Sequence, residues 1–286
     1  MASVAVIGLG GMGGRIARRL LAAGEHQIVV WNRTPEKTAE LARLGAAAAE
    51  SPAEAARRAE AVITMVADPD ALQAVTEGPS GIAAGAGPGS TVLEMSTVGP
   101  SAISRLASVL PEEVGLLDAP VLGSLEAVES GTLEIFVGGP VERFARWSPL
   151  LAELGSPHHV GPVGAGAAAK LVANATLLGM LGLLGEALAL AAGLGLAPET
   201  AFELLGATPL AAQAERRRRA VETSDYPARF SLALARKDAD LIAAAAFERG
   251  LSLPLTAAAR SWFVAAEEAG LGDRDYSAVL AHILER

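Results

Sequence analysis

The sequence predicts a two-domain α/β protein, with a doubly wound parallel sheet in residues 1–163 and an all-helical domain in residues 164–286 that opens with a long helix. Short, fully apolar runs alternate with helical patterns through the first half, as in sheets that are buried on both faces. No strand pattern appears in the second half. Of the 286 residues, 51% are hydrophobic and only 19% are charged, so each domain has enough apolar side chains for its own core.

Composition excludes several classes of function. The formal net charge of -9 argues against a general nucleic-acid binder, which needs basic surface to neutralise phosphates. The chain has no cysteine, which excludes disulfides, thiolate catalysis and Cys-ligated zinc. Its four histidines are scattered and make no metal-ligand spacing with acidic residues, so we expect no metal.

The first element is a short apolar run at residues 4–7, which predicts a central parallel strand. A glycine-rich loop follows, a helical pattern continues to Gly24, and a second strand is predicted at 28–31. In this strand, G-x-G-x-x-G, helix, strand order, the glycines allow a tight turn, close approach of a pyrophosphate and close helix packing. The predicted dinucleotide-binding loop comprises Gly8, Leu9, Gly10, Gly11, Met12 and Gly13.

The end of the second strand bears on which dinucleotide binds. The chain reads Asn32-Arg33-Thr34 there, followed by Lys37, with no carboxylate to hydrogen-bond the ribose of NAD or to repel a 2′-phosphate. The Arg33 guanidinium and the Thr34 hydroxyl can bind such a phosphate, so the sequence favours NADP(H). The alternative is that Arg33 is a solvated loop charge and Thr34 caps a helix that begins at Pro35.

The next predicted strands end in residues suited to a ligand site, because ligands lie outside the carboxyl ends of parallel strands. These strands cover residues 61–66, 91–95, 115–118 and 133–137, with a last short strand at 158–160. The candidates at their ends are Val66 and Ala67 for the cofactor, and Ser96, Gly123 and Ser124 for a small carboxylate. Ser96 and Ser124 also precede helical patterns, so each is equally suited to capping a helix.

The long helix carries a lysine and an amide on an apolar background. Lys170 and Asn174 are four residues apart, which places them on one face, and burying such a pair requires partners or a function. The alternative is a lysine that extends to solvent. The apolar run 171–184 is too short to cross a bilayer, and residues 1–7 lack the features of a signal peptide, so we expect a cytoplasmic protein without a membrane span.

The remaining chain predicts only helices, at residues 198–205, 210–221, 231–249, 254–269 and 276–285. Lys237, followed by Asp238, lies on the third of these and is a second cation able to reach a pocket. An exposed helix lysine is the simpler interpretation of Lys237.

Four separated motifs, in order along nearly the whole chain, resemble the β-hydroxyacid dehydrogenase family. This family includes 3-hydroxyisobutyrate dehydrogenases and the glyoxylate and succinic semialdehyde reductases. The motifs are Val6-Ile-Gly-Leu-Gly-Gly-Met-Gly13, Met95-Ser-Thr-Val-Gly-Pro100, Asp118-Ala-Pro-Val-Leu-Gly-Ser-Leu-Glu-Ala-Val-Glu-Ser-Gly-Thr-Leu133 and Gly164-Ala-Gly-Ala-Ala-Ala-Lys-Leu-Val-Ala-Asn174, completed by the Lys237-Asp238 pair.

The resemblance implies a Rossmann domain, a C-terminal domain like that of 6-phosphogluconate dehydrogenase, and hydride transfer between NADP(H) and a small β-hydroxy acid or semialdehyde. It implies that Lys170 is the general acid/base with Asn174 beside it, and that Ser96 and the Gly123-Ser124 turn hold the substrate carboxylate. Lys237 would close over the site from the second domain, with Asp238 beside it at the cofactor. Members of the family are dimers or tetramers.

Three positions depart from the family pattern and leave the substrate open. Leu122 replaces a serine that helps to bind the carboxylate in many members, Ala173 replaces the first of two paired asparagines, and Glu94 stands where aspartate is more common. An NADPH-dependent imine reductase of the same fold is therefore the nearest alternative, although such enzymes usually carry an acid or a tyrosine in place of Lys170. A non-catalytic NADP-binding protein is a third interpretation.

Overall fold

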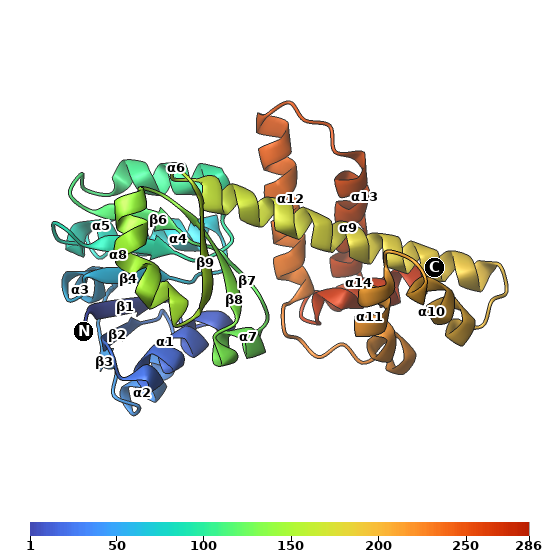
Figure 1. Ribbon diagram of the computed structural model, residues 1–286, viewed down its shortest axis with the longest axis horizontal. Coiled ribbons are helices and arrows are strands. Elements are labelled where there is room, and N and C mark those ends of the chain that lie inside the picture. Colours follow the sequence, from blue (N-terminus) through green and yellow to red (C-terminus); the bar gives the residue numbers. More distant parts are fainter. Residues whose placement is uncertain (286) are drawn as a thin grey trace. The chain divides into compact units, whose positions relative to one another are not determined.

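The computed structural model describes residues 1–285 and divides into two compact units (Figure 1). The first unit is Met1–Lys170 and the second begins at Leu171. The first contains a sheet flanked by helices, whereas the described part of the second is helical. The mixed α/β architecture of the prediction is confirmed. Its domain boundary, between residues 163 and 164, stays a prediction.

The sheet of the first unit has nine strands, of which six form a parallel block in the order β3-β2-β1-β4-β5-β6. β8 then runs antiparallel to β6, so the last part departs from the parallel pattern that the alternation predicted. The strands are β1 (Ser3–Ile7), β2 (Gln27–Trp31), β3 (Ala47–Ala48), β4 (Ala61–Thr64), β5 (Thr91–Glu94), β6 (Gly115–Asp118), β7 (Val121–Leu122), β8 (Leu133–Gly138) and β9 (Gly155–Gly161).

Helices cover both faces of this sheet (Figure 1). One core joins the sheet to α1, α7 and α8 with Leu41 of α2, and the other joins it to α3, α4, α5 and α6. β1, β4, β5 and β6 are buried along nearly all of their length, as expected of central strands with covered faces. The helices are α1 (Gly11–Ala23), α2 (Pro35–Ala42), α3 (Pro52–Arg57), α4 (Pro69–Thr76), α5 (Ile82–Gly85), α6 (Gly99–Val109), α7 (Leu125–Ser130) and α8 (Val141–Ala152).

The long helix α9 (Ala165–Gly193) begins in the first unit and continues into the second. With 29 residues and a mean hydropathy of 1.8 in its apolar window, it is the one helix among residues 1–285 long and apolar enough to span a membrane. The helix is longer than the apolar run of residues 171–184 and extends beyond it at both ends. Five of its leucines are nevertheless buried in the core of the second unit, as predicted for a core helix: Leu171, Leu178, Leu181, Leu184 and Leu188.

The second unit packs its helices around that buried side of α9. Phe263 is fully buried at its centre, together with Leu280 and Leu232. The predicted helices are all present. They are α10 (Pro198–Gly206), α11 (Ala211–Thr223), α12 (Leu232–Glu248), α13 (Pro254–Ala266) continued by a π-helical turn η1 (Glu267–Leu271), a short 3-10 turn η2 (Tyr276–Ala278), and α14 (Val279–Leu284).

Candidate active site

The glycine-rich loop connects β1 to α1, and its glycines differ in what surrounds them. Gly8 has φ +93°, and a Cβ there would lie 2.3 Å from the carbonyl oxygen of Met65. A Cβ on Gly13 would lie 1.9 Å from the carbonyl oxygen of Gly8, so α1 passes too close for a side chain. Around Gly10, by contrast, a Cβ would meet nothing within 4 Å. Gly8 and Gly13 therefore have structural roles, while the Gly10 side of the loop is open to a ligand.

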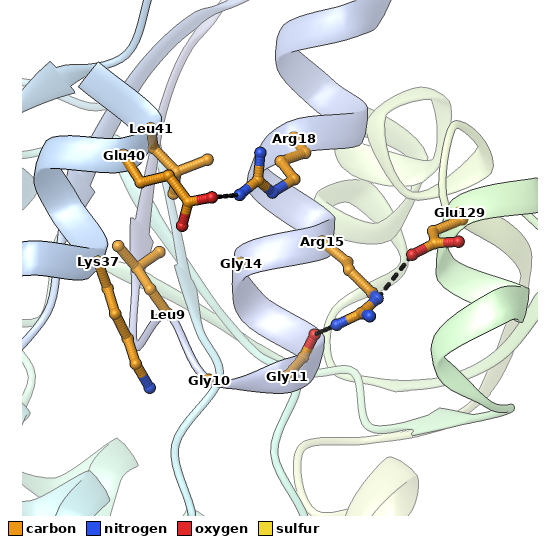
Figure 2. Close-up of a pocket in the computed structure, with 10 residues that line it drawn as sticks. All are labelled: Leu9, Gly10, Gly11, Gly14, Arg15, Arg18, Lys37, Glu40, Leu41 and Glu129. Atoms are coloured by element: carbon orange, nitrogen blue, oxygen red, sulfur yellow. Dashed lines mark hydrogen bonds and ion pairs between the residues drawn. The ribbon is translucent and has the colours of Figure 1, made fainter. Parts of the chain in front are cut away.

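A pocket of about 370 Å³ lies beside this loop, between α1 and α2 (Figure 2). Two of its three cations face carboxylates, since Arg15 Nε lies 2.7 Å from Glu129 and Arg18 pairs with Glu40. Figure 2 shows Lys37 extending alongside Leu9 and away from Glu40. The lining residues are Leu9, Gly10, Gly11, Gly14, Arg15, Arg18, Lys37, Glu40, Leu41 and Glu129.

Of the residues that follow β2, Asn32 connects the glycine-rich loop to the start of α2 by hydrogen bonds, whereas Arg33, Thr34 and Lys37 make no such side-chain bonds to the described residues. Asn32 accepts a hydrogen bond from the backbone N–H of Leu9 over 2.8 Å and donates one to the carbonyl oxygen of Thr34 over 3.1 Å. Thr34 stands at the N-cap of α2, but its side chain makes no capping bond. Within residues 1–285 the exposed side chains of Arg33 and Lys37 have no hydrogen-bond or ion-pair partner, which leaves both able to contact a ligand.

At the carboxyl ends of β4 and β5, Ser96 joins the two strand ends. Its hydroxyl oxygen accepts a hydrogen bond from the backbone N–H of Val66 over 2.9 Å, and its own backbone N–H donates to Oε1 of Glu94 over 2.9 Å. Ser96 is not a helix cap, because the N-cap of α6 is Val98. Ala67 is exposed beside it. Glu94, which stands where aspartate is more common in the family, therefore fixes the backbone of Ser96.

The Gly123-Ser124 turn precedes α7. Gly123 has φ +154°, and a Cβ there would lie 2.6 Å from Leu133 Cδ2, so this position excludes a side chain. Ser124 does cap α7, since its hydroxyl accepts from the backbone N–H of Ala127 over 3.3 Å. Both residues are exposed, whereas Leu122 is half-buried.

The first turn of α9 is held by Asp118, the last residue of β6. Asp118 Oδ1 accepts from the backbone N–H of Gly164 over 2.8 Å, and Oδ2 accepts from that of Ala167 over 2.7 Å. Burial raises the pKa of the Asp118 carboxyl, and these hydrogen bonds offset part of the rise. Three residues after Ala167 comes Lys170, which is only 8% exposed. A lysine that extends into solvent is therefore not what the structure contains.

In the second unit, Asn174 of α9 meets Asp238 of α12. Asn174 Nδ2 donates to Asp238 Oδ2 over 2.7 Å, and Lys237 Nζ lies 2.7 Å from Asp238 Oδ1. Asn174 and Asp238 are 3% and 2% exposed, and the Lys237 side chain is 18% exposed. Lys237 is therefore not the exposed helix lysine of the simpler interpretation.

The sequence patterns predicted no role in the site for Asp118 or Glu94, although one signal pointed to both residues. Asp118 and Glu94 are acidic residues at the carboxyl ends of predicted buried strands, where an unpaired carboxylate would be costly. They are paired neighbours in the register of β5 and β6. Among residues 1–285, no group of three or more His, Asp or Glu side chains is placed to hold a metal ion.

Two family models together match almost the whole chain. Residues 3–166 match the NAD binding domain of 6-phosphogluconate dehydrogenase, and residues 164–283 match the NAD-binding domain of NADP-dependent 3-hydroxyisobutyrate dehydrogenase. The chain belongs to the β-hydroxyacid dehydrogenase family. As a family member it is an NAD(P)-dependent oxidoreductase. Its first unit, which contains the glycine-rich loop, is an NAD(P)-binding domain.

Members of the β-hydroxyacid dehydrogenase family resemble it along nearly all of their length. The 2-(hydroxymethyl)glutarate dehydrogenase of Eubacterium barkeri is 32% identical over 281 residues, which cover 97% of this chain and 93% of the relative. Glyoxylate/succinic semialdehyde reductase 1 of Arabidopsis thaliana is 33% identical over 280 residues, which cover 97% and 96%. The structure of Mycobacterium tuberculosis 3-hydroxyisobutyrate dehydrogenase with L-serine has a TM-score of 0.89, 27% identity and 99% coverage of both chains.

Proposed function

We propose that this protein is an NADP(H)-dependent reductase of small carbonyl compounds that carry a carboxylate, of the semialdehyde or keto-acid type, and that Lys170 is its general acid/base. One observation carries the proposal. Lys170 is buried on α9 one turn beyond Gly166, where Asp118 fixes the helix to the carboxyl end of β6, and Ser96 follows the neighbouring strand β5. A buried ammonium near a strand end that also offers a hydroxyl is suited to a polar substrate.

The dinucleotide fits the glycine loop. The open space at Gly10 and the first-turn N–H groups of α1, which have no acceptor within the helix, suit the pyrophosphate. Beyond Gly10, the predicted cofactor contacts of Leu9, Gly11, Met12, Val66 and Ala67 belong to the same loop and the end of β4. Arg33, Thr34 and Lys37 are proposed to bind a 2′-phosphate, because no carboxylate ends β2 and neither cation is neutralised by a neighbour. Asn32 supports them by tying the two loops together.

The chain's own part in the reaction is to bind the carboxylate and to supply a proton. Bound NADPH supplies the hydride. As negative charge grows on the carbonyl oxygen, protonated Lys170 stabilises it and then donates its proton, and in the reverse direction neutral Lys170 accepts one. The Ser96 hydroxyl and the Gly123-Ser124 turn donate hydrogen bonds to the substrate carboxylate, Ser96 with a hydroxyl hydrogen that its bond from Val66 leaves available.

Asn174, Lys237 and Asp238 form a buried polar group in the second unit, and we propose that they serve the same reaction. Asn174 follows Lys170 by four residues on α9, so both side chains leave the helix on one face. Lys237 would bring positive charge to the substrate or cofactor, while Asp238 orients both of its neighbours.

Two further properties are part of the proposal. We propose that the protein is cytoplasmic and that it forms a homodimer or homotetramer. The oligomer is proposed because one stripe of α9 is apolar yet exposed in the single chain. Val172, Leu183 and Leu190 are 68%, 56% and 64% exposed, and their spacing places them on one side of the helix. Leu194, which directly follows the helix, is 71% exposed. Sedimentation velocity measures the mass directly, and a monomer at micromolar concentration would contradict this part of the proposal.

The experiment that tests the function is NADPH oxidation at neutral pH against glyoxylate, succinic semialdehyde, methylmalonate semialdehyde and tartronate semialdehyde. NADH and a cyclic imine serve as controls. We expect turnover of at least one of the carboxylate substrates, with NADPH preferred. Turnover of the imine alone would show that Leu122, beside Gly123, marks a site rebuilt for substrates without a carboxylate, and the proposal would be wrong.

A further inference from the structure

The junction between β6 and α9 contains a buried carboxylate that the proposed reaction does not use. Asp118 is fully buried at the end of β6, and burial raises the pKa of its carboxyl while hydrogen bonds from backbone N–H groups lower it. Its partners are backbone N–H groups, with one carboxylate oxygen on Gly164 and the other on Ala167. Both donors belong to the turn that starts α9, where N–H groups lack acceptors within the helix and the helix dipole favours a negative charge.

The backbone around this carboxylate leaves little room for the turn to shift. A Cβ on Gly166 would lie 2.3 Å from the carbonyl oxygen of Asp118 and 2.4 Å from that of Phe136. A Cβ on Gly138 would lie 2.5 Å from Asp118 Oδ1 and 2.8 Å from the backbone nitrogen of Gly166. Glycines at 138 and 166 thus let the helix turn approach the strand ends closely enough for the carboxylate to reach both N–H groups.

We infer that Asp118 is a positioning residue for Lys170: by capping the first turn of α9 from the end of β6, it fixes where the lysine ammonium lies relative to the strand end that carries Ser96. This inference rests on the proposed role of Lys170. The link is short, since Ala167 and Lys170 are three residues apart and therefore one helical turn. Glu94, the register neighbour of Asp118, accepts a hydrogen bond from the backbone N–H of Ser96. One acidic residue thus fixes the start of α9 and its neighbour fixes Ser96.

Asp118→Asn tests the inference with almost no change of shape. The amide keeps one acceptor oxygen but presents an NH2 group to the second N–H, so one end of the cap is lost. We expect kcat for the best carbonyl substrate to fall by about 10- to 100-fold, because displacement of a reacting group by about 1 Å is enough for such a loss. The dissociation constant for NADPH should change by less than about threefold, since the glycine loop lies on other elements.

Hydrogen exchange provides a readout that does not depend on activity. In the variant, the amides of Gly164 and Ala167 should exchange at least about tenfold faster than in the wild type, with little change elsewhere in the first unit. Ser51→Ala is the matched control, because Ser51 caps α3 by accepting from Glu54 over 3.1 Å and lies outside the proposed site. It should change neither kcat nor exchange in α9.

Gly166→Ala tests the same contact from the helix side, because its methyl group must push the turn away from the strand while Asp118 remains. It should lower kcat as Asp118→Asn does, and it carries the test if Asp118→Asn yields too little folded protein. Wild-type kcat in folded Asp118→Asn or Gly166→Ala would overturn the inference. Turnover that survives the replacement of Lys170 in an otherwise unchanged enzyme would instead overturn the proposed function.

Discussion

Asn174 and Asp238 face each other as a buried amide and a buried carboxylate, joined by a hydrogen bond of 2.7 Å from Nδ2 to Oδ2. The two residues belong to different helices of the second unit, α9 and α12, so the bond fixes one helix to the other inside an apolar core. Lys237 balances the same carboxylate from the adjacent position. A buried polar pair of this kind is costly to break from one side only.

Asn174→Ala removes the amide and leaves Asp238 short of one donor. We expect the free energy of unfolding to fall by about 1–3 kcal/mol. Urea unfolding followed by circular dichroism measures it. Thr176→Ala is the matched control on the same helix, because Thr176 is exposed and bonds only the carbonyl oxygen of Ala173, and its change should stay within about 0.5 kcal/mol. An equal decrease of the free energy of unfolding in both variants would contradict the proposed contribution of the Asn174–Asp238 hydrogen bond to stability.

Two glycines of the loop give opposite predictions. A methyl group on Gly13 meets the backbone of Gly8, so Gly13→Ala should lose about 1–3 kcal/mol of stability. A methyl group on Gly10 meets no protein atom, so Gly10→Ala should stay within about 1 kcal/mol of the wild type while NADPH binding weakens by at least about tenfold. Thermal unfolding and fluorescence titration separate the two effects. Unchanged affinity in Gly10→Ala would place the pyrophosphate elsewhere.

The cofactor preference depends on Arg33 and Lys37. Removing either side chain should lower kcat/KM for NADPH by about 10- to 100-fold, since hydrogen bonds to charged groups contribute about 1.5–3 kcal/mol, and should leave the value for NADH within about threefold. Arg43→Ala is the control, an exposed cation at the other end of α2. If kcat/KM for NADPH and kcat/KM for NADH fall equally in Arg33→Ala and Lys37→Ala, these residues do not bind the 2′-phosphate.

Much of this arrangement could be predicted from the sequence because it depends on local patterns. The apolar runs give the strands, and the glycine spacing gives the turn at Gly8 and the close packing at Gly13. What could not be predicted depends on register between distant segments. The role of Asp118 exists only because β6 ends beside residues 164–167, and the bond between Asn174 and Asp238 joins residues 64 positions apart.

Local sequence patterns were also insufficient to predict the length of α9 and the roles of Ser96 and Ser124. The apolar run of residues 171–184 indicated a helix but not its full length, because alanines and glycines continue α9 before Lys170 and leucines and alanines continue it after Glu186. Ser96 and Ser124 had the same two interpretations, and only the observed backbone separates them. Ser124 caps α7, whereas Ser96 bridges two strand ends.

The pKa of Asp118 makes stability depend on pH. Burial raises the pKa of this carboxyl above its ordinary value of 3.8. A raised pKa in the folded state means that the contribution of the group to stability is complete at acid pH and is lost as pH rises through the folded-state pKa. Asn does not titrate, so the stability deficit of Asp118→Asn relative to the wild type should shrink as the pH rises above the ordinary pKa of 3.8. Urea unfolding of both proteins at several pH values measures this deficit. A deficit that grows with pH would contradict a raised pKa for Asp118.

The central claim is that the Lys170 ammonium supplies the proton, and the most direct measurement is single-turnover NADPH oxidation by Lys170→Met. Methionine keeps an unbranched chain at this buried position, so the fold and the dissociation constant for NADPH should be retained. The account predicts that the rate of the chemical step falls by about 100-fold or more. A folded Lys170→Met variant that binds NADPH and oxidises it with substrate at the wild-type rate would contradict the claim.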